Sequence, residues 1–426
     1  MHTKIDLDKK HIVILGGGYC GLRVAKRLAK KLEKYDDYQV ILIDRNALHL
    51  YAVELYEIAN TYYPNITRAG LQDLTESITI PFSQLLHDTQ VCFIQDLILG
   101  VDSQKKTVKL FNGGEVKYEY LVVSLGSVTN YYGIPGVSEK ALPLKTIDDA
   151  LNLECHFDDL FRERFEKNDH SHFDVVIGGG GPTGVEYACQ LPSYIAKLSA
   201  KYKFDPKEVT ITIAQSGHEL MGLGPDVSNM VQQRLQRFGV EALCDAHIIG
   251  YSFGKLDISR PDGTDKRQIY ADILVWTAGV QPHPALKSFP VLHVSGCLDV
   301  GPNLEATHYP KVYVGGDDAA IFDMTHHQLL PKLGVLAVQH APIIAHNIWA
   351  DIAKKRQKTY KPRFKGYVIS LGGRSYLYHK NGKNIVGILP WLKRRLFDLW
   401  YFYSILPLVK AIKKWWRTEK IIVKNN

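Results

Sequence analysis

Two stretches of the chain share one pattern of apolar and polar positions. In each, a short β-branched run (11–15 and 173–177) leads into a glycine-rich turn, a helical pattern follows, and a second apolar run closes the unit (40–43 and 209–213). Short apolar runs bounded by glycine are typical of buried strands, and a helix between two such strands is typical of a parallel βαβ unit. The sequence therefore predicts an α/β fold with two Rossmann-like dinucleotide-binding domains.

The first glycine turn has the spacing Gly-x-Gly-x-x-Gly. Gly16, Gly18 and Gly21 hold its three glycine positions, and Asp44 ends the next strand, 23 residues beyond Gly21. Such glycines allow a tight turn and bring backbone N–H groups to a pyrophosphate at the helix N-terminus, while the acid binds a ribose. These four residues are the predicted cofactor-binding residues of a first dinucleotide site.

The second turn repeats this spacing with Gly179, Gly181 and Gly184, but the following strand ends in Gln215 instead of an acid. A neutral amide does not repel the 2′-phosphate of NADPH, yet no arginine lies nearby in the sequence to bind one. We therefore expect NADH, with NADPH as the open alternative. Two such sites in one chain favour a flavin in one domain and a nicotinamide nucleotide in the other, with hydride transfer between them.

Three further strands end in small residues and glycine. Gly126 and Gly279 each close such a run and are predicted to mark crossings between domains next to a cofactor. Asp317 follows a third run, where it is predicted to hold the ribityl hydroxyls of a flavin and to open a helix. The expected domains are a discontinuous FAD-binding domain (1–125 and 279–363), an NAD(P)H-binding domain (126–278) and a C-terminal segment (364–426).

The net charge of +8 is concentrated at the C-terminus. From residue 391 on there are nine Lys or Arg and two acids, a local charge of 9 − 2 = +7, and four of the six tryptophans of the chain. Leu408, Ile412, Trp415 and Trp416 recur at helical spacing. Lys410, Lys413, Lys414 and Arg417 are predicted to occupy the other side of that helix. This composition is typical of helices that lie in a membrane interface, although packing on the protein itself or in a homodimer stays open.

Several other classes of protein are disfavoured. The near-neutral remainder argues against nucleic-acid binding, and the polar start of the chain argues against a secretory signal. The most apolar run, 396–409, is shorter than a membrane span and contains Asp398 and Pro407. Six scattered cysteines predict neither a disulfide framework nor a metal site. Asn381-Gly382, between two alternating runs, predicts a hairpin turn.

Four segments resemble type II NADH:quinone oxidoreductases, a family of flavoproteins with two dinucleotide-binding domains. They are residues 49–59, 126–136, 179–186 and 315–317, and the resemblance extends over nearly the whole chain. It implies FAD in the first domain, NADH in the second and a membrane quinone as acceptor, in a respiratory-chain enzyme that does not pump protons. It also implies a monotopic protein facing a reducing compartment, such as the cytoplasmic side of a bacterial inner membrane.

The resemblance implies catalytic roles for three residues. Glu186 would lie where nicotinamide and flavin meet, although it could instead complement the N-terminus of its helix. Gln339 matches one of two family glutamines near the flavin and quinone, but Val335 replaces the other. His340 could donate a proton to a quinone or simply be packed in the core. Two alternatives remain: a sulfide:quinone oxidoreductase-like flavoprotein, which needs a cysteine pair, and an NADH-sensing flavoprotein.

Overall fold

The computed structural model describes residues 4–62, 68–112, 114–323, 328–364 and 366–425, which form two compact units. The first unit comprises Met1–His49, Ile80–Val128 and Val280–Phe364, and the second comprises Leu50–Thr79, Thr129–Gly279 and Lys365–Asn426. The two crossings lie within a few residues of those expected from the sequence. Residues 50–79, expected in the FAD-binding domain, group with the second unit instead, and so does the C-terminal segment, which was expected to form a part of its own.

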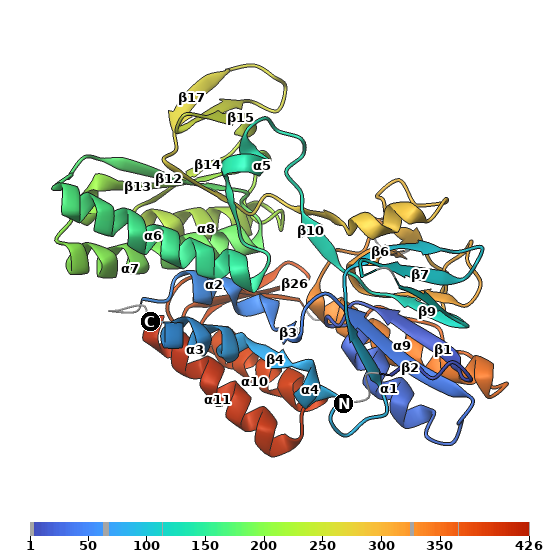
Figure 1. Cartoon of the computed structure of the whole chain (residues 1–426). Helices are drawn as coiled ribbons and strands as arrows, with labels where there is room; N and C mark the ends of the chain where they lie inside the picture. The colour runs from blue at the N-terminus through green and yellow to red at the C-terminus, as the bar shows by residue number, and fades with distance from the viewer. Residues whose placement is uncertain (1–3, 63–67, 113, 324–327, 365, 426) are drawn as a thin grey trace. The chain divides into compact units, whose positions relative to one another are not determined.

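The first unit is built on a five-stranded parallel sheet (Figure 1). Its strand order is β21 (Val312–Val314), β9 (Tyr120–Val123), β1 (Lys10–Leu15), β2 (Tyr38–Asp44) and β5 (Cys92–Gln95). Residues 12–15 of the central strand are fully buried, as expected for a parallel sheet that is covered on both faces. Helices α1 (Gly21–Lys31) and α9 (Gly334–Ile352) pack against each other on this sheet.

Smaller elements complete the first unit. An antiparallel sheet contains β6 (Ile98–Asp102), β7 (Thr107–Leu110) and β8 (Glu115–Lys117). The remaining elements are α4 (Phe82–Leu85), β19 (Val280–Pro282), η3 (Pro284–Ser288), β20 (Leu298–Asp299), η4 (Gly316–Asp318), β22 (Ala319–Ala320), β23 (Phe322–Asp323) and β24 (Gln328–Leu329). Three short strands lie at the unit boundaries: β3 (Leu48–Leu50), β4 (Thr79–Pro81) and β10 (Ser127–Thr129).

The expectation that Asp317 opens a helix is wrong. Gly316 adopts a left-handed conformation with φ +75°, and Ala319 is extended, so the chain forms only the single 3-10 turn η4. The long helix α9 begins at Gly334. The turn is therefore held by contacts of its side chains, described below, instead of by a following helix.

The second unit repeats the parallel sheet. Its order is β11 (Leu142–Pro143), β18 (Ile273–Trp276), β12 (Phe173–Gly178), β13 (Val209–Ala214) and β14 (Val240–Leu243). In both units the strand before the glycine turn is central. If that strand is numbered 1 and the later strands of the sheet are numbered along the chain, four adjacent strands have the order 4-1-2-3. The predicted pair of Rossmann-like domains is confirmed. In such sheets ligands bind at the carboxyl ends of the strands where the order reverses, which is where both glycine turns lie.

Helices and two antiparallel sheets surround this second sheet. The helices are η1 (Ala52–Glu54), α2 (Leu55–Ala59), α3 (Arg68–Ile78), α5 (Val137–Lys140), α6 (Ile147–Lys167), α7 (Pro182–Tyr202), η2 (Pro206–Glu208) and α8 (Pro225–Arg237). One antiparallel sheet contains β15 (His247–Ser252), β16 (Lys255–Ser259) and β17 (Arg267–Tyr270), and the other contains β25 (Tyr367–Ser370), β26 (Tyr376–Lys380) and β27 (Lys383–Gly387). Asn381 and Gly382 join β26 to β27 with positive φ angles, which confirms the predicted hairpin.

The chain ends in two helices, α10 (Ile388–Ile405) and α11 (Leu408–Asn425), which pack on each other (Figure 1). α10 also packs on β26 and β27, and α11 packs on α3. In the part of the chain that the structure describes, no helix is both long enough and apolar enough to cross a bilayer. The two helices are thus packed elements of the second unit.

One side of these two helices is exposed and largely apolar, and we call it the tail face. Its exposed large apolar side chains are Leu389, Leu392, Leu396, Trp400 and Tyr403 on α10 and Leu408, Val409, Ile412 and Trp416 on α11. Exposed lysines, among them Lys393, Lys410 and Lys413, lie between them along the sequence. Contiguous apolar surfaces of this kind mark contact sites for proteins or membranes.

Lys414 and Arg417 do not belong to the exposed basic side that their spacing predicts. Lys414 donates from Nζ to the carbonyl oxygens of Glu76 and Thr79, at 2.5 and 2.6 Å, and burial lowers its pKa to about 7. Arg417 forms ion pairs with Asp73 at 2.8 Å and Glu76 at 2.7 Å. Both side chains therefore hold α11 on α3, and the tail offers less free charge than its composition indicates.

Candidate functional site

The three glycines of the first turn meet two different requirements. A Cβ at Gly16 would lie 2.3 Å from the carbonyl oxygen of Ser124, and a Cβ at Gly21 would lie 1.9 Å from that of Gly16, so neither position accepts a side chain. Nothing lies within 4 Å of a Cβ at Gly18, so this position faces open space. Asp44 accepts a hydrogen bond from Gly17 N at 2.7 Å. The turn is tight, and its middle glycine leaves room for a ligand to approach the backbone.

The second turn reproduces this geometry. Gly184 would place a Cβ 1.9 Å from the carbonyl oxygen of Gly179, whereas Gly181 faces open space. Gln215 accepts from Gly180 N at 2.9 Å through Oε1, the bond that Asp44 makes in the first unit. Gln215 therefore occupies the position of the ribose-binding acid, with a neutral amide in place of a carboxylate.

The hydroxyls of Ser124 and Thr277, which are not among the predicted site residues, fix the conformation of these turns. Ser124 donates to the carbonyl oxygens of Leu15 and Gly16, at 2.9 and 3.2 Å, and Thr277 donates to those of Gly178 and Gly179, both at 3.0 Å. Each hydroxyl follows the strand next to the central one. The signal in the sequence is a hydroxyl residue two positions before Gly126 and before Gly279, but the partners of these hydroxyls become visible only once the strands are paired.

Gly126 and Gly279 both need glycine conformations, with φ +74° and +138°. A Cβ at Gly279 would lie 2.4 Å from the hydroxyl of Tyr132, while Gly126 faces open space. Gly126 N donates to Asp318 at 2.9 Å. These glycines bring the chain close to the turns at both crossings.

The Gly-Asp turn presents two carboxyl groups in different surroundings. Asp317 accepts from the hydroxyl of Ser127 at 2.5 Å. Asp318 is fully buried, and burial raises its pKa to about 8. Among the described residues, Oδ1 of Asp318 has no hydrogen-bond partner. Buried polar atoms are nearly always paired, so Asp318 fits a ligand group at this turn better than Asp317 alone, the residue that the sequence indicated.

His340 lies beside the same turn. It accepts a hydrogen bond from Gly316 N at 3.0 Å through Nδ1, and its ring meets that of Tyr360 edge-on at 4.7 Å. Burial lowers its pKa to about 4, so the ring is neutral and its proton sits on Nε2. In the described structure Nε2 has no partner. His340 thus offers a buried donor to a bound group, and its core position does not make it a ready source of protons.

Gln339 uses its amide within the protein. Nε2 donates to the carbonyl oxygens of Val335 and Arg363, at 3.2 and 3.0 Å, and Oε1 accepts from Arg363 N at 3.0 Å. The side chain therefore fastens the segment around Arg363 to α9. A direct contact with a quinone would require this clamp to open.

Glu186 is the fifth residue of α7, beyond the first turn of the helix, where the helix dipole has less effect. Its carboxylate accepts from Ser370 N at 3.1 Å, and burial raises its pKa to about 8. A carboxyl group with such a pKa can gain and lose a proton near neutral pH, as a proton relay must.

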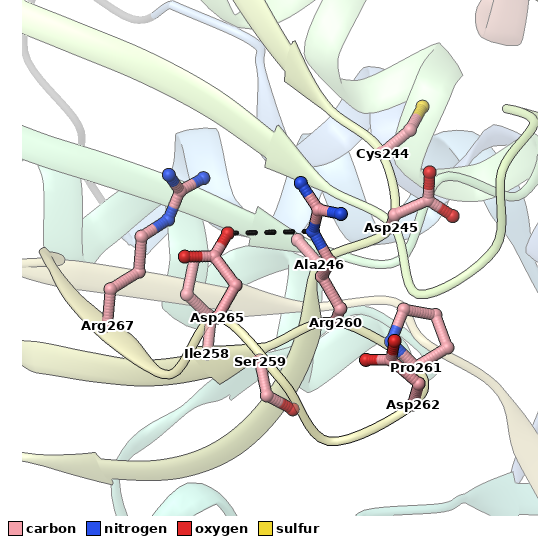
Figure 2. A pocket seen from close by; sticks show the side chains of 10 residues that line it. All are labelled: Cys244, Asp245, Ala246, Ile258, Ser259, Arg260, Pro261, Asp262, Asp265 and Arg267. Carbon is pink, nitrogen blue, oxygen red and sulfur yellow. Dashed lines mark ion pairs between the residues drawn. The ribbon is translucent and has the colours of Figure 1, made fainter.

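A cavity of about 500 Å³ adjoins the turn after Gln215. Figure 2 shows it between residues 244–246 and the hairpin 258–267, and no residue of the turn itself lines it. Asp245 N donates to the carbonyl oxygen of Gly217 at 3.2 Å. Ala246 N donates to the carbonyl oxygen of Gln215 at 2.9 Å, which links this wall to the turn. The hairpin contributes Arg260, whose Nε lies 3.7 Å from Asp265, and Arg267. Two arginines that are distant in the sequence therefore line a cavity whose opposite wall is bonded to this turn.

All six cysteines are free in the structure. Burial raises the pKa of the Cys155 thiol to about 11, with the adjacent Glu154 as a further cause. Because the thiolate is the reactive form, Cys155 is a weak nucleophile. The cysteine pair that sulfide oxidation needs has no support in the described residues.

A known family model covers most of this site. The model described as pyridine nucleotide-disulphide oxidoreductase matches residues 10–341. That span contains both glycine turns, the two crossings and the Gly-Asp turn.

The chain is also similar to individual proteins over nearly its full length. A Staphylococcus aureus protein named type II NADH:quinone oxidoreductase is 26% identical over 410 residues, 96% of this chain and 98% of the relative. The solved structure of NDH2 from Plasmodium falciparum in complex with NADH covers 98% of both chains with a TM-score of 0.82 and 17% identity. Sulfide:quinone oxidoreductase from Aquifex aeolicus matches 93% of this chain with a TM-score of 0.74 and 19% identity.

Proposed function

The chain belongs to the pyridine nucleotide-disulphide oxidoreductase family, and on this premise we propose that it is an FAD-dependent NADH:quinone oxidoreductase that does not pump protons. The observation that carries the proposal is the duplicated glycine turn, with Gly18 and Gly181 open to a ligand in both copies. The names of full-length relatives, a type II NADH:quinone oxidoreductase and an NDH2 in complex with NADH, support the same reaction.

The first unit fits FAD. The turn at Gly16, Gly18 and Gly21 offers backbone N–H groups to the pyrophosphate, and Asp44 offers a carboxylate to the ribose. The unpaired Oδ1 of Asp318 and Nε2 of His340 are the polar atoms available to the rest of the cofactor. When bound, FAD supplies the isoalloxazine ring, which accepts a hydride from NADH and passes two electrons to a quinone.

The second unit fits NADH. The turn at Gly179, Gly181 and Gly184 receives the pyrophosphate, and Gln215 binds the adenosine ribose. The cavity that Ala246 lines (Figure 2) provides space for the adenosine half of the nucleotide, since Ala246 N is bonded to the carbonyl oxygen of Gln215. Glu186 holds and releases a proton, because the reduction of a quinone by NADH takes up one proton from the medium.

Gln215→Glu should sharpen the choice of nucleotide. A carboxylate accepts hydrogen bonds from the free 2′-hydroxyl of NADH but repels the 2′-phosphate of NADPH. We expect the ratio of kcat/KM for NADH to that for NADPH to rise about tenfold, which corresponds to about 1.4 kcal/mol. Steady-state rates with both nucleotides measure it. An unchanged ratio would show that Gln215 does not contact the ribose.

The tail face docks on a membrane from which the quinone is taken. Apolar side chains enter the interface and the exposed lysines meet anionic headgroups, so the protein is peripheral and monotopic. In a bacterium this face would lie on the cytoplasmic side of the inner membrane, in a respiratory chain. Four basic residues of the tail bind the protein itself: Arg394, Arg395, Lys414 and Arg417. Apolar contacts therefore contribute more to membrane binding, and charge less, than the +7 of the tail indicates.

The double substitution Leu396→Gln and Trp416→Gln should weaken docking. Each side chain is about half exposed or more, so the fold loses little. Removing two such groups from a lipid interface costs about 3 kcal/mol, or roughly a hundredfold in binding. Sedimentation with vesicles containing anionic lipid measures this loss. Phe253→Gln, which changes an even more exposed aromatic residue away from the tail, is the control and should bind as wild type does.

Two other functions have less support. A sulfide:quinone oxidoreductase matches the fold, but all six cysteines are free, and only Cys155 and Cys244 are partly exposed. An NADH-sensing flavoprotein would use the same two cofactors with slow turnover. Bleaching of the flavin by sulfide but not by NADH would favour the sulfide:quinone oxidoreductase. Slow reoxidation of the flavin by every quinone would favour the NADH-sensing flavoprotein.

A further inference from the structure

Helix α10 has a charged inner side that membrane docking does not explain. Arg394, Arg395 and Asp398 face inward and are at most 9% exposed. Arg394 binds Glu54 at 2.9 Å through Nη2 and Asp398 at 2.9 Å through Nε. Arg395 binds the same Glu54 oxygen at 3.2 Å. We call these four residues the inner charge cluster.

Such a cluster is not the simplest way to hold a helix in place. Burying charged groups costs several kcal/mol each in desolvation, and well-packed apolar residues often stabilise a protein as much or more. Glu54, which lies in the segment 49–59 that resembles the family, is completely buried. Neither the proposed cofactor sites nor the tail face uses it, so the cluster calls for a role of its own.

Glu186 shares the surroundings of this cluster. Its hydrogen-bond donor, Ser370 N, belongs to β25, and α10 packs against β25. α7, which carries Glu186, packs on α2, where Gln190 donates to Glu57 at 2.7 Å. Both elements that hold Glu186 are thus packed against parts of the cluster: β25 against α10, which carries Arg394, and α7 against α2, which begins directly after Glu54 and carries Glu57.

We propose that Arg394 and Glu54 are positioning residues for Glu186, and that this fixed pair of opposite charges sets how readily Glu186 holds a proton. Because Arg394 lies on α10, the protonation of Glu186 then depends on how that helix is docked. The inference rests on the proposed function, in which Glu186 relays a proton during quinone reduction. The proton leaves the Glu186 carboxyl group and is replaced from the medium, so the pair changes no bond of its own.

The charges around Glu186 fix the sign of each effect. Burial raises the pKa of Glu186 to about 8; Arg394 opposes this shift, while Glu54 and Glu57 add to it. Tyr56 on α2 and Cys189 on α7 also respond to the charge of Glu186, and burial, the larger cause, keeps both neutral by raising their pKa values. Removing Arg394 should therefore raise the pKa of Glu186, and removing Glu54 should lower it.

Opposite shifts from the two partners of one ion pair distinguish this role from a structural one. Loss of either partner destabilises the fold in the same direction, whereas the electrostatic effects differ in sign. We expect Arg394→Gln to move the titration of Glu186 up by about one pH unit and Glu54→Gln to move it down by about one unit. Arg394→Lys keeps the charge and should restore the wild-type value. Glu419→Gln removes a carboxylate paired with Arg395 at 3.0 Å and should leave the titration of Glu186 in place.

The test uses the full-length, flavin-loaded protein without substrate. Infrared difference spectra against Glu186→Gln identify the carboxyl band of Glu186, and its pH titration is followed in each variant. The pH profile of kcat with NADH and a short-chain quinone is the second readout. Shifts of opposite sign in both readouts are the expected result, whereas shifts of the same sign, or none in folded variants, overturn the proposal. If Arg394→Gln does not fold, Glu54→Gln and Arg394→Lys still test the proposal, because Glu54→Gln should shift the titration of Glu186 and Arg394→Lys should not.

Failure of the two proposals can be told apart. If the wild-type protein does not reduce quinones but the infrared shifts appear with opposite signs, the charge pair acts on Glu186 and the proposed reaction is wrong. If quinone reduction proceeds and the titration of Glu186 does not respond to either substitution, the reaction stands and the positioning role is wrong.

Discussion

Gly21→Ala is expected to yield a protein without FAD. The added Cβ would lie 1.9 Å from the carbonyl oxygen of Gly16 and 2.5 Å from the hydroxyl of Ser124, a distance that atoms do not reach without moving the backbone. The turn would open and lose the N–H groups that face the pyrophosphate. We expect the flavin bound per protein, measured from absorbance after gel filtration, to fall more than about tenfold.

Two other alanine variants make this result specific. Gly184→Ala creates the same clash with the carbonyl oxygen of Gly179 in the second unit, so it should keep FAD and lose NADH binding. Gly114→Ala adds a methyl group where nothing lies within 4 Å and should leave both cofactors in place. A Gly21→Ala protein with a full complement of flavin, or a Gly184→Ala protein without flavin, would show that the two cofactors are assigned to the wrong units.

Arg395→Met is expected to destabilise the second unit strongly. The guanidinium is 3% exposed and binds Glu54 and Glu419 at 3.2 and 3.0 Å. Removing one partner from a buried network leaves an unpaired buried charge, which costs about 3–5 kcal/mol. Urea denaturation followed by tryptophan fluorescence measures this loss, since four of the six tryptophans lie in the tail.

A second substitution tests the cause of that loss. Arg395→Met combined with Glu419→Leu removes the carboxylate whose ion pair was broken, while Glu54 keeps its bond to Arg394 at 2.9 Å. The double variant should therefore regain part of the stability lost in Arg395→Met. If it is no more stable, the loss reflects poor packing of the methionine and not an unpaired charge.

The glycine turns could be predicted because their requirements are local. The spacing of Gly16, Gly18 and Gly21 and the β-branched runs around them are read from about 35 residues, and the second copy supports the first. The Asn381-Gly382 hairpin is equally local, since two residues with positive φ define it. The hydrogen bonds from Ser124 and Thr277 to these turns could not be predicted, because they depend on which strands are neighbours in the sheet.

The inner charge cluster could not be predicted for a related reason. Glu54 and Arg394 are 340 residues apart, and no periodic pattern connects them. The same limitation affects the tail: spacing alone placed Lys414 and Arg417 on an exposed side, whereas the acids and carbonyl groups of α3 hold them against the protein. A basic run indicates that charge is present, and only the fold shows which charges are already paired.

The helix expected after Asp317 fails through backbone conformation. The left-handed Gly316 and the extended Ala319 end the turn after three residues. One oxygen of each carboxyl group then accepts a hydrogen bond: Asp317 Oδ2 from the Ser127 hydroxyl at 2.5 Å and Asp318 Oδ2 from Gly126 N at 2.9 Å. A Gly-Asp sequence after a strand is compatible with either outcome, so the distinction needs the structure.

Anaerobic stopped-flow absorbance at the flavin band tests the central claim most directly. The purified, flavin-loaded protein is mixed with NADH and then with a short-chain quinone. We expect NADH to bleach the flavin rapidly and the quinone to restore its absorbance, with much slower bleaching by sulfide. If NADH leaves the flavin oxidised while sulfide reduces it, the protein is not an NADH:quinone oxidoreductase.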